Sequence, residues 1–245
     1  MSLTEVWWLQ QTEADVPPGD QWLSLWEADR AASFRIPKRR NDWRLGRWTA
    51  KCAVAMHLAM SQDAGSLSQI EVRPAASGAP EVFISNVTAD MTISLSHRAG
   101  AAICAVAATG VQLGCDLELI EPHTQGFVRD YFTAEEQAIV DTCDMGERET
   151  LVALVWSAKE SVLKALQTGL REDTRSVSVG VTDHLPGIGC WTELSIRTPG
   201  TLAISGWWQR SEKFVRTIAV LPRARLPIAL AWFRTASPSM KQDAS

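Results

Sequence analysis

The sequence contains the stretch WSAKESVLK at residues 156–164, and the start of this stretch is nearly repeated as WTAK at residues 48–51. The two segments lie 108 residues apart, almost half the chain length of 245 residues. The same offset aligns Val54 with Val162 and Leu58 with Leu166. A four-residue match can arise by chance, but each segment has helical spacing and is followed by a β-rich stretch. The repeat therefore predicts two similar halves packed as a pseudo-dimer.

Both halves are predicted to be mixed α/β (α+β), each a helix packed on a small, mainly antiparallel sheet. The first half is expected at residues 1–110 and the second at residues 111–235, with a polar, disordered tail at residues 236–245. Apolar spacing predicts helices over residues 21–34, 41–60 and 147–170, and a further helix that begins after Thr133. Strands are predicted over residues 6–9, 70–72, 111–120, 177–181, 191–196, 202–208 and 215–221, with two more inside residues 91–108.

Composition narrows the class of protein. The chain is 46% hydrophobic and 21% charged, as in ordinary globular proteins, and its net charge of −4 argues against bulk nucleic-acid binding. We find no signal peptide and no apolar run of the ~18 residues that a membrane span needs. Five scattered cysteines without CxxC spacing indicate free thiols. We therefore expect a cytoplasmic protein that binds neither nucleic acid nor a membrane.

Two acidic clusters carry the candidate chemistry. Asp116 and Glu118 are two residues apart in a predicted strand, so both side chains lie on one face. Glu160 and Lys164 are four residues apart in a predicted helix and also share a face. Three carboxylates and a lysine can together hold a hard divalent cation and a phosphate. The combination predicts phosphate-transfer chemistry.

Each cluster also has a simpler explanation. The two strand carboxylates could face solvent, and the helical pair could be a surface ion pair worth a few tenths of a kcal/mol. Trp156 lies on the same helix face as Glu160, which favours a partly buried site. The first half has Cys52 and Met56 where the second has Glu160 and Lys164, so we expect a single site, where the halves meet.

Further candidates lie outside the two clusters. Ser96 and His97, between two strand-like runs, can donate hydrogen bonds to a phosphate, and Arg98 would add charge. A basic segment that includes Arg40 and Arg47 is either a solvated face or a site for a terminal phosphate. Glu136 is either the capping-box partner of Thr133 or a general base, and the sequence does not separate the two.

The motif Gly114-x-Asp116-x-Glu118, followed by Trp156-x-x-Lys159-Glu160-Ser161-x-x-Lys164, resembles the signature of the 4′-phosphopantetheinyl transferases. The resemblance covers roughly residues 20–222, and the length and the two halves are similar to the large, Sfp-type branch. Supporting matches are Phe34, Gly46-Arg47, Gly78-x-Pro80, Ser96-His97 and Tyr131-Phe132-Thr133 leading to Glu136. Two positions depart from the usual pattern, Ala79 in the Gly-x-Pro turn and Arg98 after the histidine.

The resemblance implies a Mg²⁺-dependent transfer of the phosphopantetheine arm from coenzyme A to a serine of an acyl or peptidyl carrier protein. The other product would be adenosine 3′,5′-bisphosphate. By the same resemblance, the metal ligands would be Asp116, Glu118 and Glu160, and the base would be Glu160 or Glu136. The pyrophosphate would be contacted by Lys159, Lys164, Ser96 and His97. The 3′-phosphate and adenine would be contacted by Arg40 and Arg47. The enzyme would be a monomer. The alternative is a non-catalytic homologue that binds coenzyme A or a carrier protein.

Overall fold

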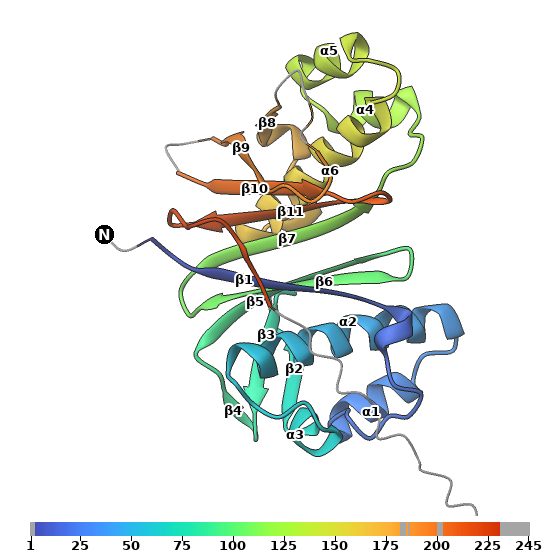
Figure 1. Cartoon of the computed structure of the whole chain (residues 1–245), viewed down its shortest axis with the longest axis vertical. Helices are drawn as coiled ribbons and strands as arrows, with labels where there is room; N and C mark the ends of the chain where they lie inside the picture. Colours follow the sequence, from blue (N-terminus) through green and yellow to red (C-terminus); the bar gives the residue numbers. More distant parts are fainter. Residues whose placement is uncertain (1–2, 182–184, 186, 200–202, 231–245) are drawn as a thin grey trace, which may run out of the picture.

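Two sheets stacked face to face form the centre of the molecule, and one long helix covers the outer face of each (Figure 1). The computed structural model describes residues 3–181, 185, 187–199 and 203–230, and the predicted tail at residues 236–245 lies outside this range. The buried apolar side chains of the described residues form four clusters: one under each long helix, one between the sheets and a smaller one around Val128, Val140 and Val152. Figure 1 shows the resulting order along the long axis of the molecule, from helices through the two sheets to helices again.

The first half contains a four-stranded sheet of order β12-β1-β6-β5 and a small sheet of order β2-β3-β4. Helix α2 packs on β6, β1 and β5. The elements are β1 (Val6–Thr12), a 3-10 turn (Glu13–Asp15), α1 (Leu25–Ala32), α2 (Pro37–His57), α3 (Ala64–Ser68), β2 (Ile70–Pro74), β3 (Pro80–Ile84), β4 (Val87–Thr88), β5 (Met91–Arg98) and β6 (Ala101–Ala108).

The second half contains a five-stranded sheet of order β7-β11-β10-β9-β8, and helix α6 packs on β7 and β11. Its elements are β7 (Gln112–Leu119), α4 (Gln125–Tyr131), α5 (Ala134–Thr142), α6 (Arg148–Ala165), two 3-10 turns (Gly169–Arg171 and Thr174–Ser176), β8 (Ser178–Gly180), β9 (Thr192–Arg197), β10 (Ser205–Arg210), β11 (Phe214–Leu221) and β12 (Ile228–Ala229).

The two halves repeat one arrangement, which confirms the predicted fold class. In the first, the order β1-β6-β5 lies against α2; in the second, the order β7-β11-β10 lies against α6. All these neighbouring strands are antiparallel. One strand crosses between the halves, because β12 pairs in parallel with β1 and thus joins the first sheet. The boundary between residues 110 and 111 stays a prediction.

Strand β7 shows how the fold prepares the site. Its odd-numbered residues Leu113, Cys115 and Leu117 belong to the apolar cluster between the sheets. Side chains alternate along a strand, so Asp116 and Glu118 point to the other face, where α6 packs. The predicted shared face of the two carboxylates is therefore the face covered by the long helix.

Two helices begin at different residues from those predicted. The helix expected from residue 21 begins at Leu25, because Ser24 caps it and exchanges hydrogen bonds with Glu27 in a capping box. The helix expected from residue 41 begins at Pro37, since proline is favoured in the first turn, where its missing N–H is not needed. The helix expected over residues 147–170 ends at Ala165, and residue 202 of the strand expected over residues 202–208 lies outside the described residues. The other predicted elements begin and end within a few residues of the observed bounds.

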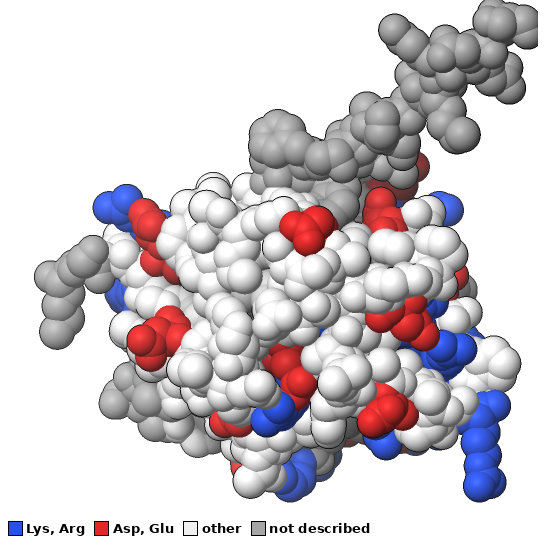
Figure 2. All heavy atoms as spheres, turned by 90° about the horizontal axis from the view of Figure 1, so that it is seen from below, with Lys and Arg blue, Asp and Glu red and all other residues white. Residues whose placement is uncertain are grey.

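Charged side chains are scattered over the face that Figure 2 shows, where the described lysines and arginines are interspersed with aspartates and glutamates. Of the helices formed by the described residues, none combines the length and the apolar character needed to cross a membrane.

Candidate active site

Asp116 is the centre of the site and is only 3% exposed. Its Oδ1 accepts hydrogen bonds from Ser96 Oγ at 2.8 Å and from Lys164 Nζ at 2.6 Å. Its Oδ2 is buried and has no hydrogen-bond partner within the described part of the chain. The strand carboxylate thus faces a packed helix instead of solvent.

Close contact between β7 and α6 allows this arrangement. A Cβ atom built on Gly114 would lie 1.8 Å from the carbonyl oxygen of Ser161 on α6. Only glycine permits this approach, which brings the helix backbone against the strand two residues before Asp116. Gly114, the residue with which the sequence motif begins, therefore has a packing role.

Glu118 lies next to Asp116 on the same face and is held by two side chains. Its Oε1 accepts a hydrogen bond from Trp156 Nε1 at 3.0 Å, and its Oε2 lies 3.4 Å from Arg98 Nε. Burial raises the pKa of Glu118 to about 7, and repulsion from Asp116 adds to the rise.

The two charged residues of α6 complete the cluster. Burial raises the pKa of Glu160, and the negative charge of Asp116 raises it further, whereas Lys164 opposes the rise. Burial alone would lower the pKa of Lys164, but attraction to Asp116 and the hydrogen bond with it raise the pKa above its ordinary value. The structure therefore brings together the two clusters seen in the sequence, with Trp156 beside them.

No group of three or more His, Cys, Asp or Glu side chains among the described residues is arranged to hold a metal ion. Lys164 and Arg98 instead supply positive charge to Asp116 and Glu118. The donors nonetheless suit Mg²⁺, which prefers carboxylate oxygens. Asp116 Oδ2 is a buried acceptor with no partner among the described residues, and burial raises the pKa values of Glu118 and Glu160, so a bound cation would stabilise their charged forms.

A cleft of about 810 Å³ lies beside the cluster, between the halves. One wall is formed by the turn of residues 77–80 and by residues 91–95 of β5. The other is formed by Lys164 near the end of α6 and by the residues that follow the helix, including Gln167 and Arg171. Gly78 has a φ of +90° in this turn, a conformation that favours glycine. Lys164 both lines the cleft and contacts Asp116, so it links the cleft to the carboxylates.

Of the four residues predicted to contact phosphate groups from β5 and the basic segment, only Ser96 contacts the carboxylate cluster. Ser96 donates its hydroxyl hydrogen to Asp116, whereas His97, the next residue of β5, is exposed and faces the opposite side by strand alternation. Arg40 forms an ion pair with Asp20 at 2.7 Å, and Arg47 lies 3.9 Å from Glu27 and 4.9 Å from the centre of the Trp43 ring. Neither arginine lines the cleft.

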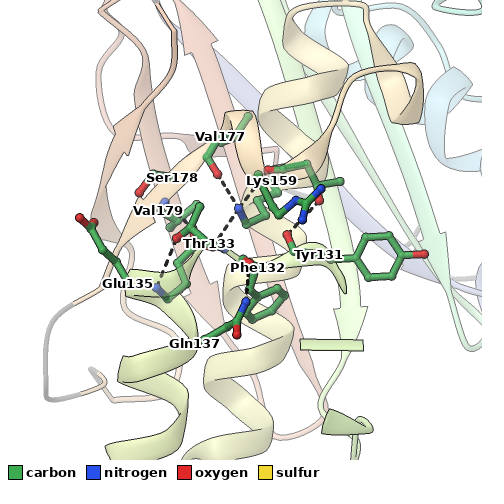
Figure 3. A network of polar contacts seen from close by, with 12 residues as sticks. Tyr131, Phe132, Thr133, Glu135, Gln137, Lys159, Val177, Ser178 and Val179 are labelled. Carbon is green, nitrogen blue, oxygen red and sulfur yellow. Dashed lines mark hydrogen bonds and ion pairs between the residues drawn. The ribbon is translucent and has the colours of Figure 1, made fainter. Parts of the chain in front are cut away.

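Glu136 and Lys159 lie away from the cleft, inside the second half, where they form a buried ion pair at 2.9 Å. Glu136 closes the predicted capping box with Thr133 and also accepts a hydrogen bond from the N–H of Val179 at 2.8 Å. Lys159 donates to the carbonyl oxygens of Thr174 and Val177, as Figure 3 shows for Val177. This geometry favours the cap over the base for Glu136.

The same arrangement occurs in the first half, and the sequence pattern did not identify it. Glu27 closes a capping box with Ser24, pairs with the buried Lys51 and accepts a hydrogen bond from the N–H of Val72 at 3.1 Å. Lys51 donates to two backbone carbonyl oxygens, as Lys159 does. The lysine shared by WTAK and WSAK thus has the same position in both copies of the internal repeat. In both copies its contacts are with the buried glutamate and backbone carbonyl oxygens, which is typical of a residue that stabilises the fold.

Two contact groups were missed from the sequence. Aromatic rings gather around Trp156: its ring centroid lies 5.1 Å from that of Phe127 and 5.0 Å from that of Tyr131. The i,i+4 spacing of these two aromatics on α4 was the available signal. The position of Arg98 between Glu118 and Glu121 had no local signal, because it depends on which strands are neighbours.

Comparison with known proteins gives one family. The family model described as the 4′-phosphopantetheinyl transferase superfamily matches residues 112–199, which include β7, α6 and all four charged residues of the cluster. This confirms the resemblance at the level of the superfamily; the Sfp-type branch stays a prediction.

Among solved structures, a similar chain is a holo-(acyl-carrier-protein) synthase from Bacillus anthracis str. Ames, in complex with CoA (3′,5′-ADP). It is 19% identical, with a TM-score of 0.39, and the match covers 46% of the present chain and 96% of that chain. No significant match was found among curated proteins.

Proposed function

We propose that this chain, whose residues 112–199 match the 4′-phosphopantetheinyl transferase superfamily, transfers the phosphopantetheine arm of coenzyme A to a serine of an acyl or peptidyl carrier protein. The oxygen of that serine would attack the pyrophosphate phosphorus next to the arm. The bond to the nucleotide would break, and adenosine 3′,5′-bisphosphate would leave.

One observation carries the proposal: Lys164 lines a cleft between the halves and binds Asp116, with Glu118 on the same strand face as Asp116 and Glu160 on the same helix face as Lys164. Transfer at a pyrophosphate needs neutralised charge and in-line positioning more than covalent help. The cluster offers carboxylates for a cation and a lysine that reaches from the cleft to Asp116. The cleft has room for a nucleotide-sized ligand.

Asp116, Glu118 and Glu160 would hold Mg²⁺. When bound, the ion would neutralise the pyrophosphate and orient it for attack. Lys164 lies between Asp116 and the cleft, and its raised pKa keeps it charged, so it is suited to contact a phosphate oxygen. Ser96 would orient Asp116 by its hydrogen bond.

Glu160 is the better candidate for the base that takes the proton of the carrier serine. Burial raises its pKa, which makes its carboxylate a stronger base than that of an exposed glutamate. Glu136, in contrast, already has partners on both carboxylate oxygens and is buried. We accordingly propose no role in the transfer for Glu136 or Lys159.

The remaining assignments follow from the proposed reaction. We propose a monomer, because the repeat places two halves in one chain and the cleft lies between them. The free thiols of all five cysteines suit a reducing cytoplasm. Coenzyme A and an apo carrier protein would be the partners. Arg40 and Arg47 would contact the 3′-phosphate only if α2 residues extend the ligand site beyond the cleft described above.

The test is the intact mass of a panel of apo carrier proteins after incubation with this protein, coenzyme A and Mg²⁺. We expect at least one carrier to gain the mass of one phosphopantetheine arm, and the gain to be lost with EDTA. No gain on any carrier, with coenzyme A binding still measurable, would reject transfer and leave a non-catalytic binder. A gain that persists in EDTA would reject the metal requirement.

A further inference from the structure

Ser96 and Arg98 of β5 each contact one of the two carboxylates of β7. They are two residues apart on β5, so they share a face, and Ser96 binds Asp116 while Arg98 pairs with Glu118. The β5–β6 hairpin fixes this position, because Ala99 and Gly100 form a two-residue turn with φ values of 48° and 77°. The guanidinium also contacts Glu121.

Both carboxylate oxygens of Glu118 have a neighbouring donor or positive charge. Trp156 already donates to Oε1, and Arg98 Nε lies 3.4 Å from Oε2. Asp116, in contrast, keeps Oδ2 free of any partner among the described residues. A cation shared by the two carboxylates would therefore find an oxygen without a partner on Asp116, whereas on Glu118 it would meet the charge of Arg98 beside Oε2.

We propose that Arg98 competes with a divalent cation for Glu118 and so weakens metal binding at this site. The inference rests on the proposed function, from which it takes the metal.

Exposure indicates that Arg98 can give way. The Arg98 side chain is 46% exposed and already contacts Glu121, which is 36% exposed, whereas Glu118 is 17% exposed, so the guanidinium can keep water and Glu121 as partners when it leaves Glu118. The Lys164 side chain is 28% exposed and pairs with a nearly buried carboxylate, so moving it would leave a buried charge uncompensated. Arg98 is thus the cation of the cluster that a metal ion displaces at low cost.

The test is direct titration of the full chain with Mn²⁺, with free ion measured by electron paramagnetic resonance, without coenzyme A or carrier protein. We expect Arg98→Gln, and Arg98→Ala as a second variant, to bind Mn²⁺ about two- to fivefold more tightly than the wild type. Arg175→Gln is the matched control, since it removes one arginine from an exposed pair with Asp173 on another part of the surface. Its Mn²⁺ affinity should equal that of the wild type.

The outcomes separate the two proposals. If all proteins bind Mn²⁺ with equal affinity, the Arg98 inference is wrong and the metal site stands. The same holds if Arg175→Gln tightens binding as much as Arg98→Gln, because the effect would then be one of net charge. If none binds Mn²⁺, both the metal assignment and the Arg98 inference are wrong.

Discussion

At the scale of single residues, Asp116 combines burial with an unused hydrogen-bond acceptor. Leaving such a group unpaired costs about 1–3 kcal/mol, and most buried polar atoms in proteins are paired. Nearby, the raised pKa values of Glu118 and Glu160 indicate two carboxylates whose charge the fold disfavours. Such local penalties are typical of sites where a ligand supplies the missing partner.

The Glu160 carboxylate should matter for transfer and not for stability. We expect Glu160→Gln to reduce the transfer rate by about a hundredfold or more, because it removes both a base and a negative ligand. The melting temperature should be unchanged or higher, since the fold already favours the uncharged form. Asp116→Ala should likewise abolish transfer. Rates follow from carrier mass against time, with the exposed Glu135→Gln as control. Near-normal turnover in Glu160→Gln would reject its role.

Glu118 should make stability depend on pH. Its pKa is about 7 in the fold and 4.5 ordinarily, so between these values the folded state binds more protons than the unfolded state. The free energy of unfolding therefore falls as pH rises from 4.5 toward 7. Above pH 7, Glu118→Gln should be more stable than the wild type by about 1–3 kcal/mol, with no such gain at low pH.

Urea unfolding of both proteins across this pH range, in EDTA, measures the difference. A constant difference between the two proteins from pH 4 to pH 8 would contradict a raised pKa of Glu118.

At the scale of elements, both halves use the same buried connection between a short helix, a long helix and a strand. In each, a capping glutamate, Glu27 or Glu136, pairs with a buried lysine of the long helix and accepts a backbone N–H of the neighbouring strand. Burial lowers the pKa of each lysine, while the glutamate opposes this. The connection holds α1 to α2 and α5 to α6.

The repeat supplies its own control for the role of Glu136. We expect Glu136→Gln and Glu27→Gln each to lower the free energy of unfolding by about 3 kcal/mol or more, since each leaves a buried lysine without its counter-charge. Both should keep most of the transfer rate per folded molecule. The measurements are urea unfolding and carrier mass. A large loss of rate with unchanged melting in Glu136→Gln alone would instead identify a base.

The contact between β7 and α6 should depend on Gly114. We expect Gly114→Ala to lower the free energy of unfolding by about 3 kcal/mol or more, because the added Cβ would overlap the Ser161 carbonyl and push the helix away. Gly46→Ala is the control: no atom lies within 4 Å of a Cβ there, and the position is helical, so stability should rise by up to about 1 kcal/mol. Equal stability of Gly114→Ala and the wild type would contradict the close approach of helix and strand.

At the scale of the whole molecule, the sheets share one apolar core and the chain closes on itself. Ile103 and Ala105 of β6 pack in the same cluster as Cys115 of β7 and Ile218 of β11. Strand β12 returns from the second half to pair with β1. Separating the halves would expose this core, so we expect them to unfold together.

Urea unfolding should therefore show a single transition, with coincident curves from tryptophan fluorescence and far-ultraviolet circular dichroism. Two resolved transitions, or curves that do not coincide, would show that the halves are independent units.

Local patterns in the sequence determined much of this protein. Three of its features depend only on residues a few positions apart. These are the helical spacing of WSAKESVLK, the capping box of Thr133 and Glu136, and the shared face of Asp116 and Glu118. The repeat of WTAK and WSAK predicted the two halves, because a duplicated packing pattern uses the same residues twice. Such features follow from the periodicity of helix and strand.

Only the tertiary structure decided which of these residues meet. The decisive contacts join residues 15 to 23 positions apart in the chain. They are the hydrogen bond of Ser96 with Asp116, the ion pair of Arg98 with Glu118, and the contacts that bury Lys159 within its own half. Strand neighbours and helix docking are selected by the burial of apolar surface over the whole molecule, and no local spacing encodes that selection. For this reason two lysines of one motif, five residues apart, have different surroundings. Lys159 forms a buried ion pair with Glu136, whereas Lys164 lines the cleft.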